Sequence, residues 1–365
     1  MNLLNSFRFP VIYLALIASL NAHAYPGESI VLDPSSGDYI ITYWDEEEPA
    51  GLEKGTFIPA TKINPSVQSR FRMDEKGVVI YRYKVRSDNF SRQIIGTVRF
   101  EFPQSLIGVQ DWPKTNREMV TEAQLAAVYD ANSAALASPH GWSGGIFSRS
   151  GYRISWNSSP DPDTGIRPGS TVGGYGFSSL SLPGVGFAQL EGDHPPRGWS
   201  GPGPTEQSAI KSQLKQLEDN DFVSRNAAVP TVVVPVPFDA AILINNIRSH
   251  VATWPGKQLI DPAFATQLDR YMAAAADAFR LNNTKAGKEQ IESLRKMLDR
   301  EHKYLDHDDE DNDDTLEHKH ATRLTIDRLA ARVLDFDLRY VLKRTERGHE
   351  HEHGDGDRRK EQGRK

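Results

Sequence analysis

The stretch that most constrains the fold of this chain is 165–193, where turn residues and strand-forming residues alternate. Pro168-Gly169 and Pro183-Gly184 are predicted turns, because proline presets φ at the second turn position and glycine accepts a positive φ at the third. The residues between them are typical of a strand with a bulge or a close backbone approach. A glycine-rich phosphate loop needs a strand before it and a helix after it, and neither is indicated. The stretch therefore predicts paired β-strands.

The first 24 residues have the pattern of an export signal. Arg8 gives a positive start, 11–20 is an apolar run, and Ala22-His23-Ala24 is a small-x-small cleavage site. We expect a signal peptide over 1–24 and a secreted or periplasmic mature protein. The apolar run is too short for a membrane span, and no later run reaches the roughly 18 apolar residues required. No transmembrane segment is expected in the mature chain.

Charge and cysteine content exclude several classes of function. Loss of Arg8 with the leader changes the formal net charge from -6 to -7, which argues against a nucleic-acid partner. The chain has no cysteine, although an exported protein could form disulfides. Thiol catalysis and cysteine zinc sites are therefore excluded, and stability must come from packing.

Short strand patterns follow one another through residues 25–204. Segment 39–44 is one predicted strand, and 78–86 and 94–102 alternate apolar and polar residues as half-buried antiparallel strands do. Residues 87–91 are predicted to be a hairpin connection between the last two strands. The region predicts an antiparallel β-sandwich.

Two further features belong to the same β-rich region. Segment 152–156 is another predicted strand, and 121–136 is a predicted helix with a threonine cap, or a loop insertion. Tyr81, Tyr83 and Phe100 suggest a sugar-stacking platform, but aromatic residues on strands are more often core or cross-strand pairs. We expect these three in the core.

Residues 205–258 are predicted to be a proline-rich connection with short helices. A short helix is indicated within 205–220 and an amphipathic helix within 238–251. Segment 229–237 is extended and contains several prolines, so it is either an edge strand or a rigid linker.

Apolar residues recur every three to four positions in residues 259–344, which predicts a three-helix bundle. Asp261 caps the first helix, with proline at its first position, and Asn282-Asn283 ends it. Thr284 is the predicted cap of the second helix. The predicted fold class is therefore a multidomain β-then-α chain, an antiparallel β-sandwich followed by a small three-helix bundle.

Both parts resemble known secreted bacterial domains. The phrase LIDPAFATQLDRYMAAAADAFRLNNTKAGKEQIESL, within 259–343, resembles the FIMAH-type helical domain, which is appended to secreted hydrolases and surface proteins. This chain departs from that pattern by an insertion at 306–314. The β-part is similar to uncharacterised secreted β-sandwich domains in an I-x-PG…GF-x-S…LPG run, at Ile166, Pro168, Gly169, Gly176, Phe177, Ser179, Leu182, Pro183 and Gly184. Neither resemblance implies an activity.

The insertion 306–314 holds seven acids in nine positions. Asp309, Asp311 and Asp313 have the odd spacing of an EF-hand start, but Asp314 replaces the required glycine and His320 the terminal glutamate. One interpretation is a weak divalent-cation site, with His307 as a further ligand beside the three aspartates. The other is a solvated acidic loop facing the arginines of the next helix. No other cofactor is indicated.

The charged tail 345–365 is predicted to be disordered, and its HEHEH sequence at 349–353 would bind nickel, copper or zinc weakly. No catalytic motif is recognisable: Ser143 and Ser200 lie in Gly-Trp-Ser-Gly sequences that lack the spacing of a nucleophile elbow. The favoured function is a non-catalytic secreted or periplasmic binding protein for an unknown protein or carbohydrate ligand. The alternative is a secreted hydrolase whose catalytic site forms no sequence motif. A deep cleft with converging titratable groups would favour the enzyme, and shallow faces would favour the binding protein.

Overall fold

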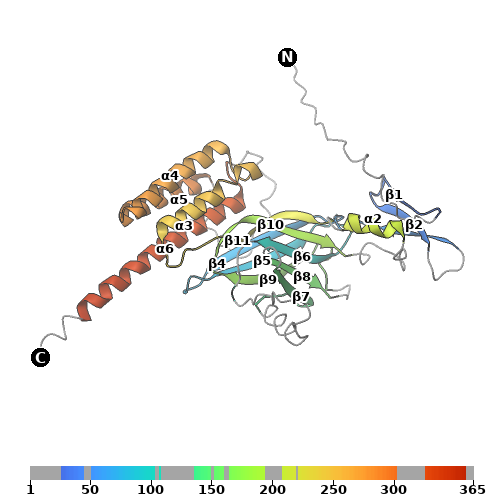
Figure 1. Ribbon diagram of the computed structural model, residues 1–365, viewed down its shortest axis with the longest axis horizontal. Helices are drawn as coiled ribbons and strands as arrows, with labels where there is room; N and C mark the ends of the chain where they lie inside the picture. Colours follow the sequence, from blue (N-terminus) through green and yellow to red (C-terminus); the bar gives the residue numbers. More distant parts are fainter. Residues whose placement is uncertain are drawn as a thin grey trace, which may run out of the picture. The chain divides into compact units, whose positions relative to one another are not determined.

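The computed structural model describes residues 26–44, 51–102, 107, 135–148, 152–159, 164–193, 208–218, 221–301 and 325–358 (Figure 1). In these residues, three antiparallel sheets are followed by a mainly helical C-terminal part. The predicted order of β-structure and then helices is confirmed. The chain divides into two compact units: Met1–Ala60 with His194–Asp221, and Thr61–Asp193 with Phe222–Lys365.

The first unit is a small sheet with one helix. Strands β1 (Ser29–Leu32), β2 (Tyr39–Trp44) and β3 (Leu52–Phe57) form an antiparallel sheet in that order, and α2 spans Ala209–Glu218. Its core joins Ile41, Tyr43 and Phe57 to two residues of α2, Ile210 and Leu214. The predicted strand at 39–44 and the short helix within 205–220 are confirmed, but the sequence did not indicate that they belong to one core.

The second unit contains two sheets. One has the order β4-β5-β9, formed by β4 (Pro65–Met73), β5 (Val79–Ser87) and β9 (Thr171–Ser179). The other has the order β11-β10-β6-β8-β7, formed by β6 (Ile95–Phe102), β7 (Trp142–Ser148), β8 (Tyr152–Ser158), β10 (Leu182–Gly192) and β11 (Val223–Val232). β11 covers the start of segment 229–237 as an edge strand of this sheet, which is one of the two predicted alternatives.

Aromatic residues of the two sheets share one core. The rings of Tyr83 on β5 and Phe100 on β6 have centroids 4.3 Å apart, and those of Phe177 and Trp156 are stacked at 6.5 Å. Tyr81, Tyr83 and Phe100 are at most 1% exposed, which confirms their prediction as core residues. The alternation of β5 therefore buries one side of the strand and exposes the other.

The predicted hairpin through 87–91 is wrong. β5 pairs with β4 and β9, whereas β6 pairs with β8 and β10 in the other sheet. Alternation shows that each strand has one buried face, but it does not show which strand lies beside it. The chain passes between sheets at this point.

One of the two predicted proline-glycine turns is correct and the other is wrong. At Pro168-Gly169, Ser170 N donates to Arg167 O at 2.9 Å and Gly169 has φ +80°, as a type II turn requires. Pro183-Gly184 lies inside β10, where Pro183 pairs with Pro230 beside a register shift. Glycine is needed at position 184, because the backbone there lies so close to the side chains of Thr231 and His250 that an added Cβ would overlap them.

The helices of the second unit are α3 (Ala240–Val251), the short η3 (Pro255–Lys257), α4 (Pro262–Arg280), α5 (Thr284–Glu301) and α6 (Arg328–Arg358). Asp261 caps α4 by accepting from Ala263 N at 2.8 Å, and Asn282 has φ +57°, both as predicted. The cap of α5 differs from the prediction, because Asn283 Oδ1 accepts from Ala286 N at 3.1 Å one residue before Thr284. Asparagine is among the preferred N-cap residues.

Helices and sheets of this unit share a continuous hydrophobic core. Phe336 of α6 contacts Phe71 of β4 edge-to-face with centroids 5.1 Å apart. Helix α6 continues to Arg358, into the tail 345–365 that the sequence predicts to be disordered. No helix in the described part of the chain is long and apolar enough to cross a membrane.

Several predictions lie outside the described residues. They are the leader 1–24, most of the predicted helix 121–136, and the acidic loop with Asp309, Asp311, Asp313 and His307.

Candidate functional site

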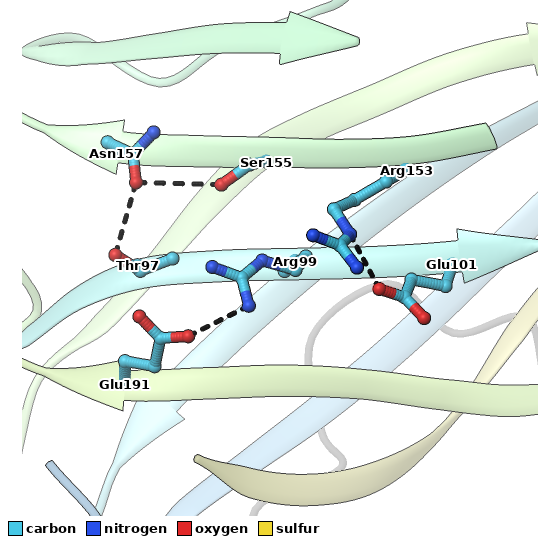
Figure 2. A network of polar contacts seen from close by, with 7 residues as sticks. All are labelled: Thr97, Arg99, Glu101, Arg153, Ser155, Asn157 and Glu191. Carbon is cyan, nitrogen blue, oxygen red and sulfur yellow. Dashed lines mark hydrogen bonds and ion pairs between the residues drawn. The ribbon is translucent and has the colours of Figure 1, made fainter. Parts of the chain in front are cut away.

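Polar side chains gather on the outward face of three neighbouring strands of the five-stranded sheet, β10, β6 and β8 (Figure 2). β6 alternates between Val98 and Phe100, which are fully buried, and polar residues on the opposite side. We call the polar set the outer network: Thr97, Arg99 and Glu101 on β6, Arg153, Ser155 and Asn157 on β8, and Glu191 on β10.

The charged members of the outer network are paired. Arg99 Nη1 lies 3.0 Å from Glu191 Oε1, and Arg153 Nε lies 2.6 Å from Glu101 Oε1. Both pairs are partly exposed, so each contributes about 0.2–1 kcal/mol at most. Two cations and two carboxylates compensate one another, and the network as a whole carries no net charge.

The neutral members of the network are joined through Asn157. Its Oδ1 accepts from Thr97 Oγ1 at 3.1 Å and from Ser155 Oγ at 3.5 Å (Figure 2). Asn157 is exposed, and its amide nitrogen remains a donor toward a ligand. Arg99 Nε is buried and has no hydrogen-bond partner within the described residues.

An open groove of about 460 Å³ adjoins the network and shares Glu101 with it. The groove lies between strands β10 and β11 and the end of α3 with η3. Its lining is Glu101, Val185, Gly186, Phe187, Gln189, Val229, Thr231, His250, Thr253 and Lys257. Phe187 is 48% exposed, and Lys257 Nζ lies 6.0 Å from the centroid of its ring. Apolar, amide, hydroxyl and charged groups therefore meet in one open depression.

His250 is held tightly at the end of α3. Its Nε2 accepts a hydrogen bond from Val185 N at 3.2 Å, and its ring meets Trp254 edge-on with centroids 5.7 Å apart. Burial, with a smaller contribution from the charge of Lys257, lowers the pKa of His250 to about 4. The imidazole is therefore neutral at pH 7, with its proton on Nδ1.

Two titratable groups of the groove, Glu101 and His250, are engaged in structural contacts. Glu101 binds Arg153, and the acceptor nitrogen of His250 is used by the backbone of β10. A general base needs a free lone pair within reach of the substrate proton. The arrangement offers hydrogen bonds and an aromatic ring to a bound molecule rather than an unpaired acid and base.

The residues of the predicted metal site, Asp309, Asp311, Asp313 and His307, are not among those that the structure describes. Within the described residues, no three metal-ligating side chains converge. Ser143 lies on β7 and donates to Asn157 O at 3.5 Å.

Sequence reasoning missed Glu101, Gln189 and His250, because they come from a strand, a second strand and a helix far apart in the chain. The one available signal was the alternation of polar residues in TVRFE at 97–101 and RISWN at 153–157, which marks outward faces. Only the sheet order shows that the two faces adjoin.

No protein-family model, no curated protein and no solved structure matches this chain. The resemblances to the FIMAH-type domain and to secreted β-sandwich domains therefore stay predictions.

Proposed function

We propose that the chain is an exported, non-catalytic binding protein. Its binding site is the outer network together with the adjoining groove. The observation that carries the proposal is that an open groove joins a polar sheet face whose charges are already compensated. Such a surface favours a ligand recognised by hydrogen bonds and apolar contact.

A neutral carbohydrate fits this chemistry better than a protein ligand. Thr97, Asn157 and Gln189 supply hydroxyl and amide groups, and Phe187 supplies an exposed ring at the groove. Carbohydrate hydroxyl groups both donate and accept hydrogen bonds, as these side chains do. A standard protein interface instead centres on buried aromatic or arginine anchors.

The finer architecture belongs to the same proposal. We take the two sheets of the second unit as a β-sandwich and its helices as a bundle packed on it. The cross-sheet contact of Tyr83 with Phe100 and the Phe71–Phe336 contact support this. The cleavable leader 1–24 and secretion or periplasmic location are part of the proposal, as is weak cation binding at 306–314.

The hydrolase alternative receives less support from the groove. Its carboxylate is paired with an arginine, and its histidine is neutral and hydrogen-bonded to the backbone. A hydrolase would need one of these contacts to break during each turnover.

The test is a screen of neutral oligosaccharides against the full mature chain, by calorimetry and by release of reducing ends. We expect binding without hydrolysis for at least one glycan. Asn157→Ala and Gln189→Ala should each weaken binding about fivefold to tenfold, since one hydrogen bond contributes about 1 kcal/mol. Ser293→Ala, on the exposed side of α5, is the control and should leave affinity unchanged. Glycan turnover, or binding unaffected by both site variants, would contradict the proposal.

A further inference from the structure

One cation in the lining of the groove is not paired with a carboxylate. The lining holds three titratable side chains, those of Glu101, His250 and Lys257. Glu101 Oε1 accepts from Arg153 Nε at 2.6 Å (Figure 2), and burial keeps His250 neutral by lowering its pKa to about 4. Within the described residues, Lys257 forms no ion pair. The groove therefore carries one positive charge that neither its own lining nor the outer network neutralises.

The backbone at Lys257 is held by Trp254, whose side chain is buried. Trp254 O accepts from Lys257 N at 3.0 Å and from Leu259 N at 3.1 Å. Gln258 then turns the chain in the left-handed conformation, with φ +59°, and its N donates to Pro255 O at 3.1 Å. These bonds keep the backbone of Lys257 in place at the groove. Its side chain is exposed, so the ammonium group can change rotamer to meet a bound molecule.

The ammonium group lies at the same ring that the proposed function assigns to a sugar. Lys257 Nζ is 6.0 Å from the centroid of the Phe187 ring, which is itself half-exposed. A cation beside an exposed ring is held weakly. Hydrogen bonds between an ammonium group and a carboxylate are about twice as strong as those between neutral groups. A carboxylate on a sugar packed against Phe187 would therefore draw the ammonium group to its own oxygens.

The neighbouring groups limit how much negative charge a ligand can bring. Glu101 lines the same groove, so a densely charged chain would place its anions beside a carboxylate. Lysine is a compact point charge, without the planar fork by which arginine holds phosphate or sulfate through two bonds. The hydroxyl groups of Thr231 and Thr253 and the amide of Gln189 remain for sugar hydroxyls. This lining favours a mainly neutral oligosaccharide with one carboxylate.

We infer that Lys257 selects oligosaccharides that carry a single carboxylate, as a uronic acid does, over their neutral counterparts. The inference rests on the proposed function, because it adds one charged substituent to the ligand of the same site. The acidic sugar lies against Phe187 with its carboxylate at Lys257 Nζ, and the neutral sugars continue along the outer network. Lys257 is then a specificity-determining residue of the groove.

The experiment is calorimetry on the full mature chain with matched pairs of oligosaccharides. The neutral members are cellotriose, maltotriose and galactotriose, and each acidic member has C6 of its non-reducing sugar oxidised to a carboxylate. A further pair is made in the same way from the tightest-binding glycan of the neutral screen. One partly exposed ion pair changes an affinity by up to about fivefold. In a pair that binds, the acidic member should therefore bind about threefold to fivefold more tightly at low salt. This preference should largely disappear at about 1 M salt, because screening weakens the ion pair and spares the neutral contacts.

Three variants separate the charge of Lys257 from the fold. Lys257→Gln should bind both members of a pair equally, with an affinity for the neutral member within about twofold of wild type. Lys257→Arg keeps the charge and should keep the preference. Lys285→Gln removes the same charge from an exposed position of α5, so this matched control should also keep the preference. All three should have the circular dichroism melt of wild type.

The outcomes distinguish this inference from the proposed function. Equal affinity of wild type for both members of the pairs that bind, or a preference that survives in Lys257→Gln, would overturn the inference and leave the proposed function standing. Acetate that binds as tightly as the acidic oligosaccharides would also overturn it, since the sugar would then contribute nothing. Binding of no member of any pair would contradict the proposed function, and the inference with it.

Discussion

Replacing His250 should remove a specific loss of stability in acid. His250 is neutral in the folded chain, with a pKa lowered from 6.5 to about 4 by burial and by Lys257. As the pH falls below 6.5, the pKa of His250 in the unfolded chain, the unfolded state takes up a proton before the folded state does. The stability present above pH 6.5 is therefore lost progressively down to about pH 4.

The magnitude follows from the size of the shift. One pKa unit corresponds to about 1.4 kcal/mol, so the full loss from His250 is about 3 kcal/mol, most of it complete by about pH 4.5. His250→Gln keeps an acceptor for Val185 N but does not titrate. Between about pH 6.5 and pH 4.5, the free energy of unfolding of wild type should therefore fall by about 2–3 kcal/mol more than that of the variant.

The assay is urea unfolding followed by tryptophan fluorescence, since Trp254 is 1% exposed and touches the His250 ring. His140→Gln is the matched control: His140 is exposed, and this variant keeps His250, so it should follow wild type. If wild type and His250→Gln lose equal stability over this range, the account of His250 as a buried neutral acceptor is refuted.

Two further predictions concern the acidic residues of α6. Asp337 is buried with an oxygen that has no hydrogen-bond partner in the described residues, and burial raises its pKa well above the usual value. The folded chain keeps the Asp337 proton, so the free energy of unfolding should fall by up to about 1.4 kcal/mol per pH unit above about pH 4. In urea unfolding, Asp337→Asn should abolish this dependence on pH. The same dependence in the variant and in wild type would refute the prediction. Asp335 is buried and pairs with Arg295 at 2.8 Å and Arg339 at 2.5 Å. Asp335→Asn should lower the free energy of unfolding, measured by thermal unfolding, by about 3 kcal/mol or more. The control Asp277→Asn, which removes a carboxylate from the exposed pair with Arg280, should lower it by less than about 1 kcal/mol. Equal losses in the two variants would contradict the prediction.

The helical part was largely predictable from the sequence. The 3.6-residue period and the Asp261 cap locate α4, and the helix predicted within 238–251 corresponds to α3. These signals are local, because a helix satisfies its own backbone and shows its buried face within a few turns. The cap of α5 was misplaced by one residue, since both asparagine and threonine are suitable caps.

The sheet arrangement was not predictable from local pattern. The faces of β5 and β6 were correct, but their pairing was wrong, because alternation is compatible with any neighbour. Pro183-Gly184 has the sequence of a turn and the structure of a strand, because Gly184 makes room for Thr231 and His250 from elsewhere in the chain.

The candidate binding site depends on strand pairing. The groove combines Glu101, Gln189 and His250, which come from two strands and a helix. The outer network needs β6 to lie between β10 and β8, which only the sheet order shows.

The central claim is that the outward face of β10, β6 and β8 binds a ligand without transforming it. The most direct measurement is hydrogen–deuterium exchange of the full mature chain with a neutral oligosaccharide that the calorimetric screen identifies, with the sugar recovered and weighed by mass spectrometry. The account predicts slowed exchange in peptides covering 97–101, 153–157 and 184–191, and recovery of the sugar at its original mass. Protection confined to other segments, or a shortened sugar, would contradict it.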